Sequence, residues 1–424
     1  MKQEEQARKL LRAELTGNRG VGHSGYLRDG VDQSRRTIYL TSMHRINRIK
    51  ETLHASDRFV ARRFGRHLVV ELLTAHRVLS TSARGGGQQD ELRYLVNHQS
   101  CEARGDVARQ ELIRRLGLVG YHDHVCSEIG VDPETAAVMG TAANMAYAVH
   151  RWAEFEDIRA NAFVTADVSG NAARASDPAQ WVETDDGWRK LANQGTINTI
   201  LLLNCPITAS AQARAVVTMT EAKSAVLTEL AVPSLYSPTI ATGTGTDQFC
   251  LAAPLDPGRK ARDSTSPHVK LGEIIGVAVK DATKEALRWQ NGLEPSCIRG
   301  LFHALGRFGL TEERALSGLA ELLPEEQHTF LQKNRKAVFF APGVAAAAYA
   351  FAAVLDRIAF GTLPPGIAQE SLRQQAASLA CSLAARPQDW PLFRHELAET
   401  GEEPDDTMDL VIRALALGWK SKWA

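Results

Sequence analysis

The sequence predicts an α+β protein, with a central sheet flanked by helices and an additional all-α C-terminal domain. Two observations predict this class. Short runs of β-branched and aromatic residues alternate with helical patterns up to residue 292, and almost no strand pattern follows. A length of 424 residues also exceeds what one hydrophobic core usually holds. We therefore divide the chain into an N-terminal arm (1–36), a mixed domain (37–292) and a helical domain (293–424).

The composition argues against several classes of protein. Lys+Arg and Asp+Glu are equal at 49 each, so no net charge attracts the chain to nucleic acid or anionic lipid. The six cysteines are scattered and form no CxxC pair. The N-terminal stretch MKQEEQARKLLRAEL is charged and lacks an apolar signal core, which predicts a cytoplasmic protein. Pro342 and Gly343 interrupt the apolar run 337–355, so we expect a buried helix there and no membrane span.

The mixed domain begins with strand-like runs and a helical segment. Turn-compatible residues separate the strands, and three glycines in ARGGGQQ break the pattern before the last of them. The strand-like runs are RFVARRF (58–64), HLVVELL (67–73), RVLSTS (77–82) and RYLVNHQS (93–100). Apolar residues at helical spacing follow in GDVARQELIRRLGL (105–118).

The second half of the mixed domain has the strongest patterns. NAFVTADV (161–168) predicts a strand, and the nearly continuous apolar run TINTILLLN (196–204) predicts a central strand buried on both faces. Residues 210–230 repeat apolar positions at helical spacing. Residues 266–289 are expected to form a helix with Ser266 as its N-cap and Pro267 at the first position.

The stretch SPTIATGTGTDQFCLAA (237–253) contains more turn residues than a hairpin needs. It alternates threonines with glycines before an aspartate: Thr242, Gly243, Thr244, Gly245, Thr246 and Asp247. Glycines let backbone N–H groups approach a ligand closely, and threonine hydroxyls bond to amide groups. A ligand-binding loop and a plain Gly-rich hairpin are the two interpretations of this stretch.

Four motifs in sequence order resemble the adenosylcobinamide amidohydrolase family of the CbiZ type. They are GTINTILLLN, ITASAQARAVVTMTEAKSAVLTELAV, ATGTGTD and HVKLGEIIG. The turns VLSTSARGGG, VMGTAANM and VTADVSGNAARA are also similar to that family. The resemblance covers roughly residues 60–290, and ordered motifs over such a span are far more specific than one Gly-rich loop. It implies nothing for residues 293–424.

The resemblance implies an enzyme of corrinoid salvage in cobalamin biosynthesis. Such an enzyme hydrolyses the amide between a propionyl side chain of the corrin ring and the aminopropanol arm of adenosylcobinamide, which yields adenosylcobyric acid. The corrinoid is then the substrate, the sequence requires no cofactor, and the need for a divalent metal stays open. The alternatives are a corrinoid-binding or delivery protein without hydrolysis and an amidohydrolase for another polar amide. The C-terminal helices suit a lid, a homo-oligomer interface or a docking surface equally well.

Amide hydrolysis needs an activated nucleophile, stabilisation of the oxyanion and an acid for the leaving amine. The sequence contains no GxSxG, HExxH or SxxK motif, so the site is either unconventional or metal-assisted. We expect water to attack the carbonyl with His268 or Glu221 as its base. The loop Thr242–Asp247 then stabilises the oxyanion, and Asp247 is itself a candidate base or metal ligand.

The candidate bases have neighbours that bear on their roles. Glu221 and Lys223 point about 200° apart on a helix, so only one of them can face a shared site. If the stripe that contains Glu221 is buried, burial raises the pKa of this carboxyl, but a solvated face fits the spacing equally well. A helix N-terminus favours neutral imidazole at His268, with Lys270 and Glu273 nearby, whereas a surface histidine in the capping region is the alternative.

The remaining candidates lie in turns and strand ends. The turn after RVLS offers corrin-binding groups or oxyanion donors: Ser80, Ser82, Gly85, Gly86 and Gly87. Asn97 is a further substrate-binding candidate beside His98. His122 and His124 in YHDHVC would share one face of a strand as metal ligands, but a polar surface loop fits better because no further ligand is fixed by spacing. Possible pocket walls are Thr141, Asn144, Thr165, Asp167 and Asn171.

Overall fold

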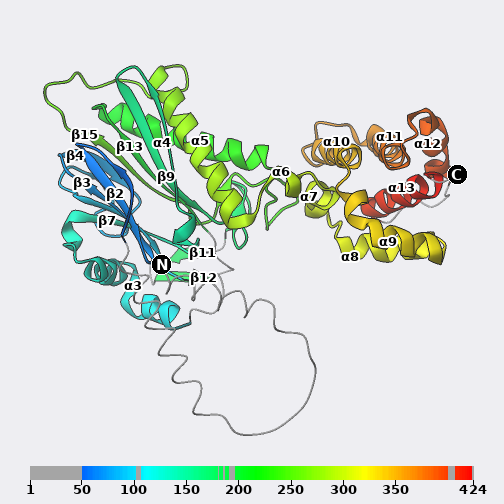
Figure 1. Ribbon diagram of the computed structural model, residues 1–424, viewed down its shortest axis with the longest axis horizontal. Coiled ribbons are helices and arrows are strands. Elements are labelled where there is room, and N and C mark those ends of the chain that lie inside the picture. Colours follow the sequence, from blue (N-terminus) through cyan, green and yellow to red (C-terminus); the bar gives the residue numbers. More distant parts are fainter. Residues whose placement is uncertain are drawn as a thin grey trace, which may run out of the picture. The chain divides into compact units, whose positions relative to one another are not determined.

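The computed structural model describes residues 50–101, 107–179, 181–184, 187–190, 196–399 and 406–422. The expected N-terminal arm lies outside these residues. The fold class is confirmed, because mixed sheets and helices make up the N-terminal part and a run of helices makes up the C-terminal part (Figure 1). The strands form two sheets, where the sequence patterns led us to expect one.

Sheet A has five strands in the order β1-β2-β3-β6-β7, all antiparallel except for the parallel pair β6 and β7. In four of these strands, alternate residues are apolar and face the second sheet, sheet B. The residues between them face a helix or solvent. The bounds are β1 (Glu51–Ala55), β2 (Phe59–Phe64), β3 (His67–Leu72), β6 (Tyr94–Gln99) and β7 (Ala136–Thr141).

Sheet B has six strands in the order β5-β4-β15-β13-β9-β8. Its centre is β13, which is buried at all seven positions, as its continuous apolar run predicted. The bounds are β4 (His76–Ser80), β5 (Gly87–Gln89), β8 (Val149–Phe155), β9 (Ile158–Ala166), β13 (Ile197–Leu203) and β15 (Gln248–Pro254). Two small ribbons complete the strands: β10 (Ala172–Ala173) with β14 (Gly243–Thr244), and β11 (Trp181–Thr184) with β12 (Gly187–Lys190).

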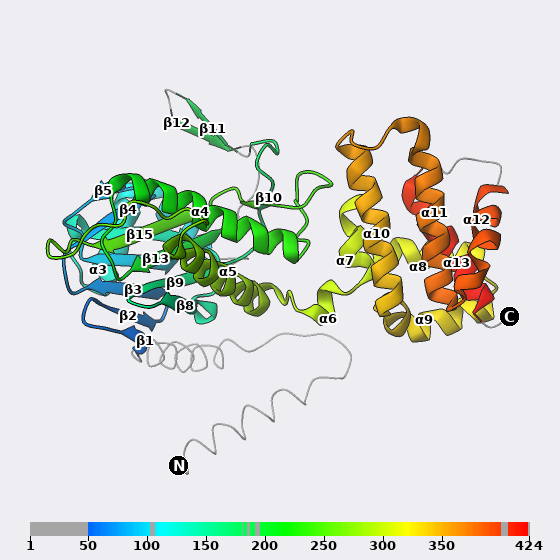
Figure 2. The ribbon, with the colours of Figure 1, turned by 90° about the horizontal axis from the view of Figure 1, so that it is seen from above.

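The two sheets pack face to face between layers of helices. One apolar core lies between the sheets and includes Leu95, Phe163 and Ile200. A second core joins sheet B to α4 (Ala209–Glu229) and α5 (Lys270–Asn291), which cover its other face (Figure 2). A smaller core joins sheet A to α3 (Val107–Ile129). This arrangement buries both faces of β13, because sheet A covers one face of the strand and the helices α4 and α5 cover the other.

Strand directions bring several loops to one end of the two sheets. β13 and β15 are parallel, and β4 and β9 run antiparallel to them, so the starts of β13 and β15 lie beside the ends of β4 and β9. The end of β7 joins this group, because Gly140 N donates to Gln248 Oε1 at 2.9 Å. We call this end the loop edge. It holds the Thr/Gly stretch, which leads directly into β15.

Two local expectations are corrected by the structure. YHDHVC lies within α3 and is neither a strand nor the polar surface loop that we expected, so His122 and His124 do not share a strand face. His122 Nε2 contacts Pro133 O at 3.1 Å, whereas His124 Nε2 lies 3.3 Å from Glu128 Oε1. The helix expected from Ser266 begins at Lys270, because residues 266–269 form a turn closed by a hydrogen bond from Val269 N to Ser266 O.

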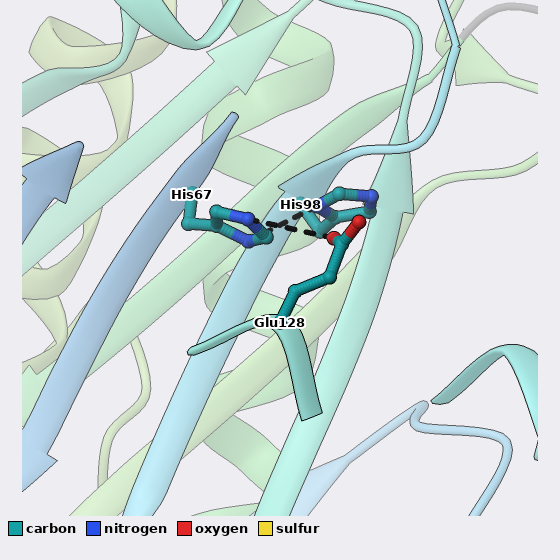
Figure 3. A group of neighbouring side chains, drawn as sticks. All are labelled: His67, His98 and Glu128. Atoms are coloured by element: carbon teal, nitrogen blue, oxygen red, sulfur yellow. Dashed lines mark hydrogen bonds and ion pairs between the residues drawn. The ribbon is translucent and has the colours of Figure 1, made fainter. Parts of the chain in front are cut away.

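A polar cluster lies between α3 and sheet A. We call it the histidine cluster, and it comprises His67 on β3, His98 on β6 and Glu128 on α3 (Figure 3). Burial lowers the pKa of His67 to about 4, although the charge of Glu128 acts in the opposite direction. Burial also holds the pKa of His98 well below its usual range. Both imidazoles are therefore neutral near pH 7.

His150 on β8 makes stability depend on pH. Burial lowers its pKa to about 4, although its hydrogen bond with Asn161 acts in the opposite direction. Its pKa in the unfolded chain is about 6.5, so the unfolded state takes up the proton first as the pH falls. The part of the free energy of unfolding that depends on neutral His150 is therefore fully present above about pH 6.5, and it is lost progressively as the pH falls to about 4.

We expect His150→Gln to flatten this dependence, because the glutamine amide can still bond to Asn161 but does not titrate. Between pH 7 and pH 5 the parent should lose about 2 kcal/mol more of its free energy of unfolding than the variant. Urea unfolding at the two pH values measures the difference. Equal losses in the two proteins would contradict the assignment of neutral His150 to the folded state.

The C-terminal helices have their own apolar core, which runs from Leu301 to Trp419. Within the described residues, α10 is the one helix long and apolar enough by composition to cross a membrane, and its Phe351 is buried in this core. The helices are α6 (Pro295–Ile298), α7 (Leu301–Leu305), α8 (Glu312–Leu322), α9 (Glu325–Phe339), α10 (Pro342–Ala359), α11 (Pro365–Ala384), α12 (Trp390–Glu399) and α13 (Thr407–Ser421).

Candidate active site

The carboxylate of Asp247 organises the Thr/Gly loop at the loop edge. Its Oδ1 accepts hydrogen bonds from Ile197 N at 3.0 Å and from Thr244 Oγ1 at 2.5 Å. Its Oδ2 accepts a hydrogen bond from Thr244 N at 3.1 Å and pairs with the ammonium of Lys223. Both oxygens are thus occupied, and the carboxylate joins the loop to the start of β13 and to α4.

Lys223 reaches this carboxylate because α4 begins at the far end of sheet B and is long enough to return to the loop edge. Thr208 caps the helix by accepting a hydrogen bond from Ala211 N at 3.2 Å. The helix begins after the end of β13 and returns along sheet B, so its last turns lie at the loop edge. The Lys223 side chain is only 13% exposed. Glu221, which points to another side of the same helix, is exposed and does not line the cavity described below.

The two glycines of the loop lie against the ends of polar side chains. A Cβ on Gly243 would lie 2.5 Å from Asp247 Oδ2 and 2.8 Å from Lys223 Nζ. A Cβ on Gly245 would lie 2.8 Å from Asn171 Nδ2. Side chains at these positions would therefore displace the polar groups around the loop.

A cavity of about 760 Å³ opens beside the loop. This is within the range of about 300–1,000 Å³ that is typical of small-molecule sites. Residues with polar or charged side chains predominate among those that line it, which include every residue from Thr242 to Asp247 together with Lys223 and Ser224. The lining therefore offers hydroxyl groups, backbone groups, one ammonium and carboxylates to a ligand.

The cavity is also lined by residues that sequence reasoning did not single out. Asp177, Tyr236 and Arg174 line it together with Asn171, and Tyr236 Oη donates to Asn171 Oδ1 at 2.8 Å. Burial acts to raise the pKa of Asp177, but hydrogen bonds from Ser234 and other donors lower it overall. The turn VTADVSGNAARA was the sequence signal that could have pointed to these residues, because it leads into them. Its Asn171 accepts a hydrogen bond from Gly245 N, and the adjoining β10 pairs with β14 in the Thr/Gly loop.

The Gly-rich turn after β4 lies at the loop edge but outside this cavity. Ser80 and Ser82 are buried, and Ser82 Oγ accepts a hydrogen bond from Val138 N at 3.0 Å. A Cβ on Gly86 would lie 2.3 Å from Ser82 O, so the turn packs tightly on itself. Gly85 is exposed. None of these four residues is among those that line the cavity.

Asn97 is part of a buried polar network between the sheets. Its Nδ2 donates to Thr165 Oγ1 at 2.8 Å, and its Oδ1 accepts from Asn198 Nδ2 at 2.9 Å. Asn97 and Asn198 are both fully buried. This network joins β6, β9 and β13 inside the domain, so Asn97 stands behind the loop edge and does not line the cavity.

The other expected wall residues serve mainly as turn and strand-end groups. Asp167 accepts hydrogen bonds from Ser169 N and from Asn291 Nδ2, which ties the end of β9 to the end of α5. Thr141 Oγ1 accepts from Ala143 N, and Asn144 Oδ1 accepts from Ala146 N. Of these expected residues, Asn171 lines the cavity.

His268, Lys270 and Glu273 lie at the far end of the domain from the loop edge. The last residue of α5, Asn291, contacts Asp167 at the loop edge. A helix of 22 residues is about 33 Å long, so its first turn is far from the cavity. His268 is exposed, and Lys270 forms a surface ion pair with Glu273 at 2.8 Å. The expectation that these residues share one site with Asp247 is therefore corrected.

Comparison with known proteins identifies the family of this chain. The profile of a family described as adenosylcobinamide amidohydrolase (CbiZ) matches residues 50–295, which is more than half of the chain. The chain is also 33% identical over 237 residues to an uncharacterized protein of Methanocaldococcus jannaschii. That alignment covers 54% of this chain and 88% of the archaeal protein. Both sheets, α3 to α5 and the cavity lie within the matched residues.

Proposed function

Because the chain belongs to the adenosylcobinamide amidohydrolase family, we propose that it hydrolyses adenosylcobinamide to adenosylcobyric acid and an aminopropanol product. One observation carries the proposal: the Thr/Gly loop lines a cavity that also presents the paired side chains of Lys223 and Asp247. The periphery of a corrin ring carries amide side chains, which suit a lining of hydroxyl and backbone groups.

In the proposed reaction, water adds to the carbonyl carbon of the substrate amide, and the C–N bond then breaks. Negative charge develops on the carbonyl oxygen and needs fixed donors close to it. Lys223 supplies a cation at the cavity wall, and Asp247 holds that cation in place. Lys223 is therefore the proposed oxyanion-stabilising group, and Asp247 is a positioning residue.

The attacking water must also lose a proton, and a carboxylate is a suitable acceptor. The described residues place Asp177 and Asp247 on the cavity lining. Both carboxylates accept hydrogen bonds from backbone and hydroxyl donors, Asp177 from Arg174 N and Ser234 Oγ, but Asp247 is in addition paired with the Lys223 ammonium. We therefore assign the role of base to Asp177, which hydrogen bonds keep ionised near pH 7. The protonated carboxyl can then return the proton to the departing amine.

The proposal is tested by incubating the full chain with adenosylcobinamide and detecting the products by mass. Equal amounts of cobyric acid and aminopropanol are expected. Asp177→Asn and Lys223→Met should each lower kcat by at least about 10²-fold. Glu221→Gln and His268→Ala are the control variants and should retain the parent rate, because both residues lie outside the cavity lining.

The alternative is a corrinoid-binding or delivery protein, which would bind adenosylcobinamide tightly and release no cobyric acid. Release of product from another polar amide, but not from adenosylcobinamide, would instead identify a different amidohydrolase substrate. If the two cavity variants turn over like the parent, this placement of the active site is wrong.

A further inference from the structure

The histidine cluster combines the donor groups of a transition-metal site. His67, His98 and Glu128 each present one ligand atom, and these atoms all lie within 4.8 Å of one another (Figure 3). They come from β3, β6 and α3, which are far apart in the chain. We propose that the histidine cluster binds one divalent transition-metal ion, which joins α3 to sheet A.

The distances between the donor atoms are close to those around a small ion. His67 Nδ1 lies 3.1 Å from His98 Nδ1, and the other ring nitrogen of His67, Nε2, lies 3.6 Å from Glu128 Oε2. Because one imidazole gives one nitrogen to an ion, either His98 or Glu128 must move closer to the nitrogen of His67 that binds it. Two nitrogen ligands at about 2.0–2.1 Å from a tetrahedral zinc ion lie roughly 3.3 Å apart. The two imidazoles are stacked, with their planes inclined by 27°, so a common ion requires one ring to turn out of the stack.

The surrounding groups allow His98 to coordinate through Nδ1. In that tautomer the proton of His98 is on Nε2, and Tyr121 Oη lies 2.9 Å away as its acceptor. Arg109 also contacts His98 Nε2, at 3.1 Å, and this hydrogen bond would be given up on coordination. Arg109 keeps its bonds to Tyr121 Oη and Glu128 Oε1, both at 3.0 Å. The ion therefore replaces two protein hydrogen bonds of His98, the one with Arg109 and the one between its Nδ1 and His67 Nδ1.

Groups outside the three ligands would orient them, as is usual around bound metals. Arg109 and His124 both approach Glu128 Oε1, which leaves Oε2 directed at His67. The side chain of Glu128 is 28% exposed, so an ion can enter from solvent at this point. His98 is fully buried and supplies the inner end of the site.

The ligand chemistry selects the class of metal. Two imidazoles with one carboxylate suit Zn²⁺ and neighbouring first-row divalent ions, whereas Mg²⁺ and Ca²⁺ prefer oxygen ligands. The site is separate from the proposed catalytic cavity, because His98 faces α3 while its neighbour Asn97 faces sheet B. This inference therefore does not depend on the proposed amidohydrolase activity.

The test uses the full chain after removal of metals with a chelator, titrated with ZnCl₂ in a calorimeter. One zinc ion per chain is expected to bind at the histidine cluster. A 100-fold excess of zinc over its Kd should raise Tm by about 5 °C. Glu128→Gln keeps the size of the side chain but removes a charged ligand, and it should weaken binding by at least about 10-fold.

Glu134→Gln is the matched control, because Glu134 is an exposed carboxylate just after α3 that pairs with Arg84 instead of the cluster. It should bind zinc as the parent does. His67→Gln provides a second ligand variant, and retention of the parent's unfolding transition shows that it folds. The inference is overturned if the parent binds no zinc, or if Glu128→Gln and His67→Gln both leave the affinity and the Tm shift unchanged.

Discussion

Asp247→Asn is expected to lower kcat/KM for the release of cobyric acid by about 10³-fold. The carboxylate accepts from two backbone N–H groups, from Thr244 Oγ1 and from Lys223. Asparagine has one acceptor oxygen, so its amide NH₂ would replace the second carboxylate oxygen and would face the donors that this oxygen now accepts from. The loop and Lys223 would then lose their fixed positions. Steady-state kinetics with adenosylcobinamide measure the loss.

Asp256→Asn is the matched control for this prediction. Asp247 immediately precedes β15 and Asp256 closely follows it, and their side chains are 20% and 26% exposed. Each pairs with a cation, Asp247 with Lys223 and Asp256 with Arg58. The control should keep the parent's kcat/KM because it lies at the opposite end of the strand. Unchanged turnover in Asp247→Asn would remove this carboxylate from the proposed mechanism.

Gly243→Ala is expected to lower kcat by about 10²-fold by displacing the Lys223–Asp247 ion pair. The new Cβ would lie 2.5 Å from Asp247 Oδ2 and 2.8 Å from Lys223 Nζ, and both are closer than ordinary contacts. One of the two side chains must therefore move away from its present position. The loss should fall on kcat more than on the Kd for adenosylcobinamide, and single-turnover and binding measurements separate the two.

Gly258→Ala is the control for the glycine substitution. Its added Cβ would have Asp256 Oδ1 as its nearest neighbour at 3.6 Å, which is ordinary van der Waals contact. Its turnover should equal that of the parent. If Gly243→Ala also retains full turnover, the position of the Lys223–Asp247 pair is not important for catalysis.

The assignment of residues to strands and helices was largely predictable because the apolar periodicity is local. The buried run of β13 and the helical spacing of α4 are visible in single segments of the chain. The division of the strands into two sheets was not predictable, since strand pairing joins residues that are distant in sequence. β4, for example, pairs with β15. We predicted that α5 would begin at Ser266 because Ser and Pro often stand at the start of a helix. Ser266 and Pro267 form a turn instead, and the helix begins at Lys270.

By itself the sequence determined the composition of the Thr/Gly loop, and hence that Asp247 and flexible glycines occur together. The tertiary structure decided which distant residues meet them. It placed Lys223 and not Glu221 at the cavity, added Asp177 and Tyr236, and left His268 at the far end of α5. The physical reason is that the face a helix presents, and the end of the sheet a loop reaches, are set by packing between layers.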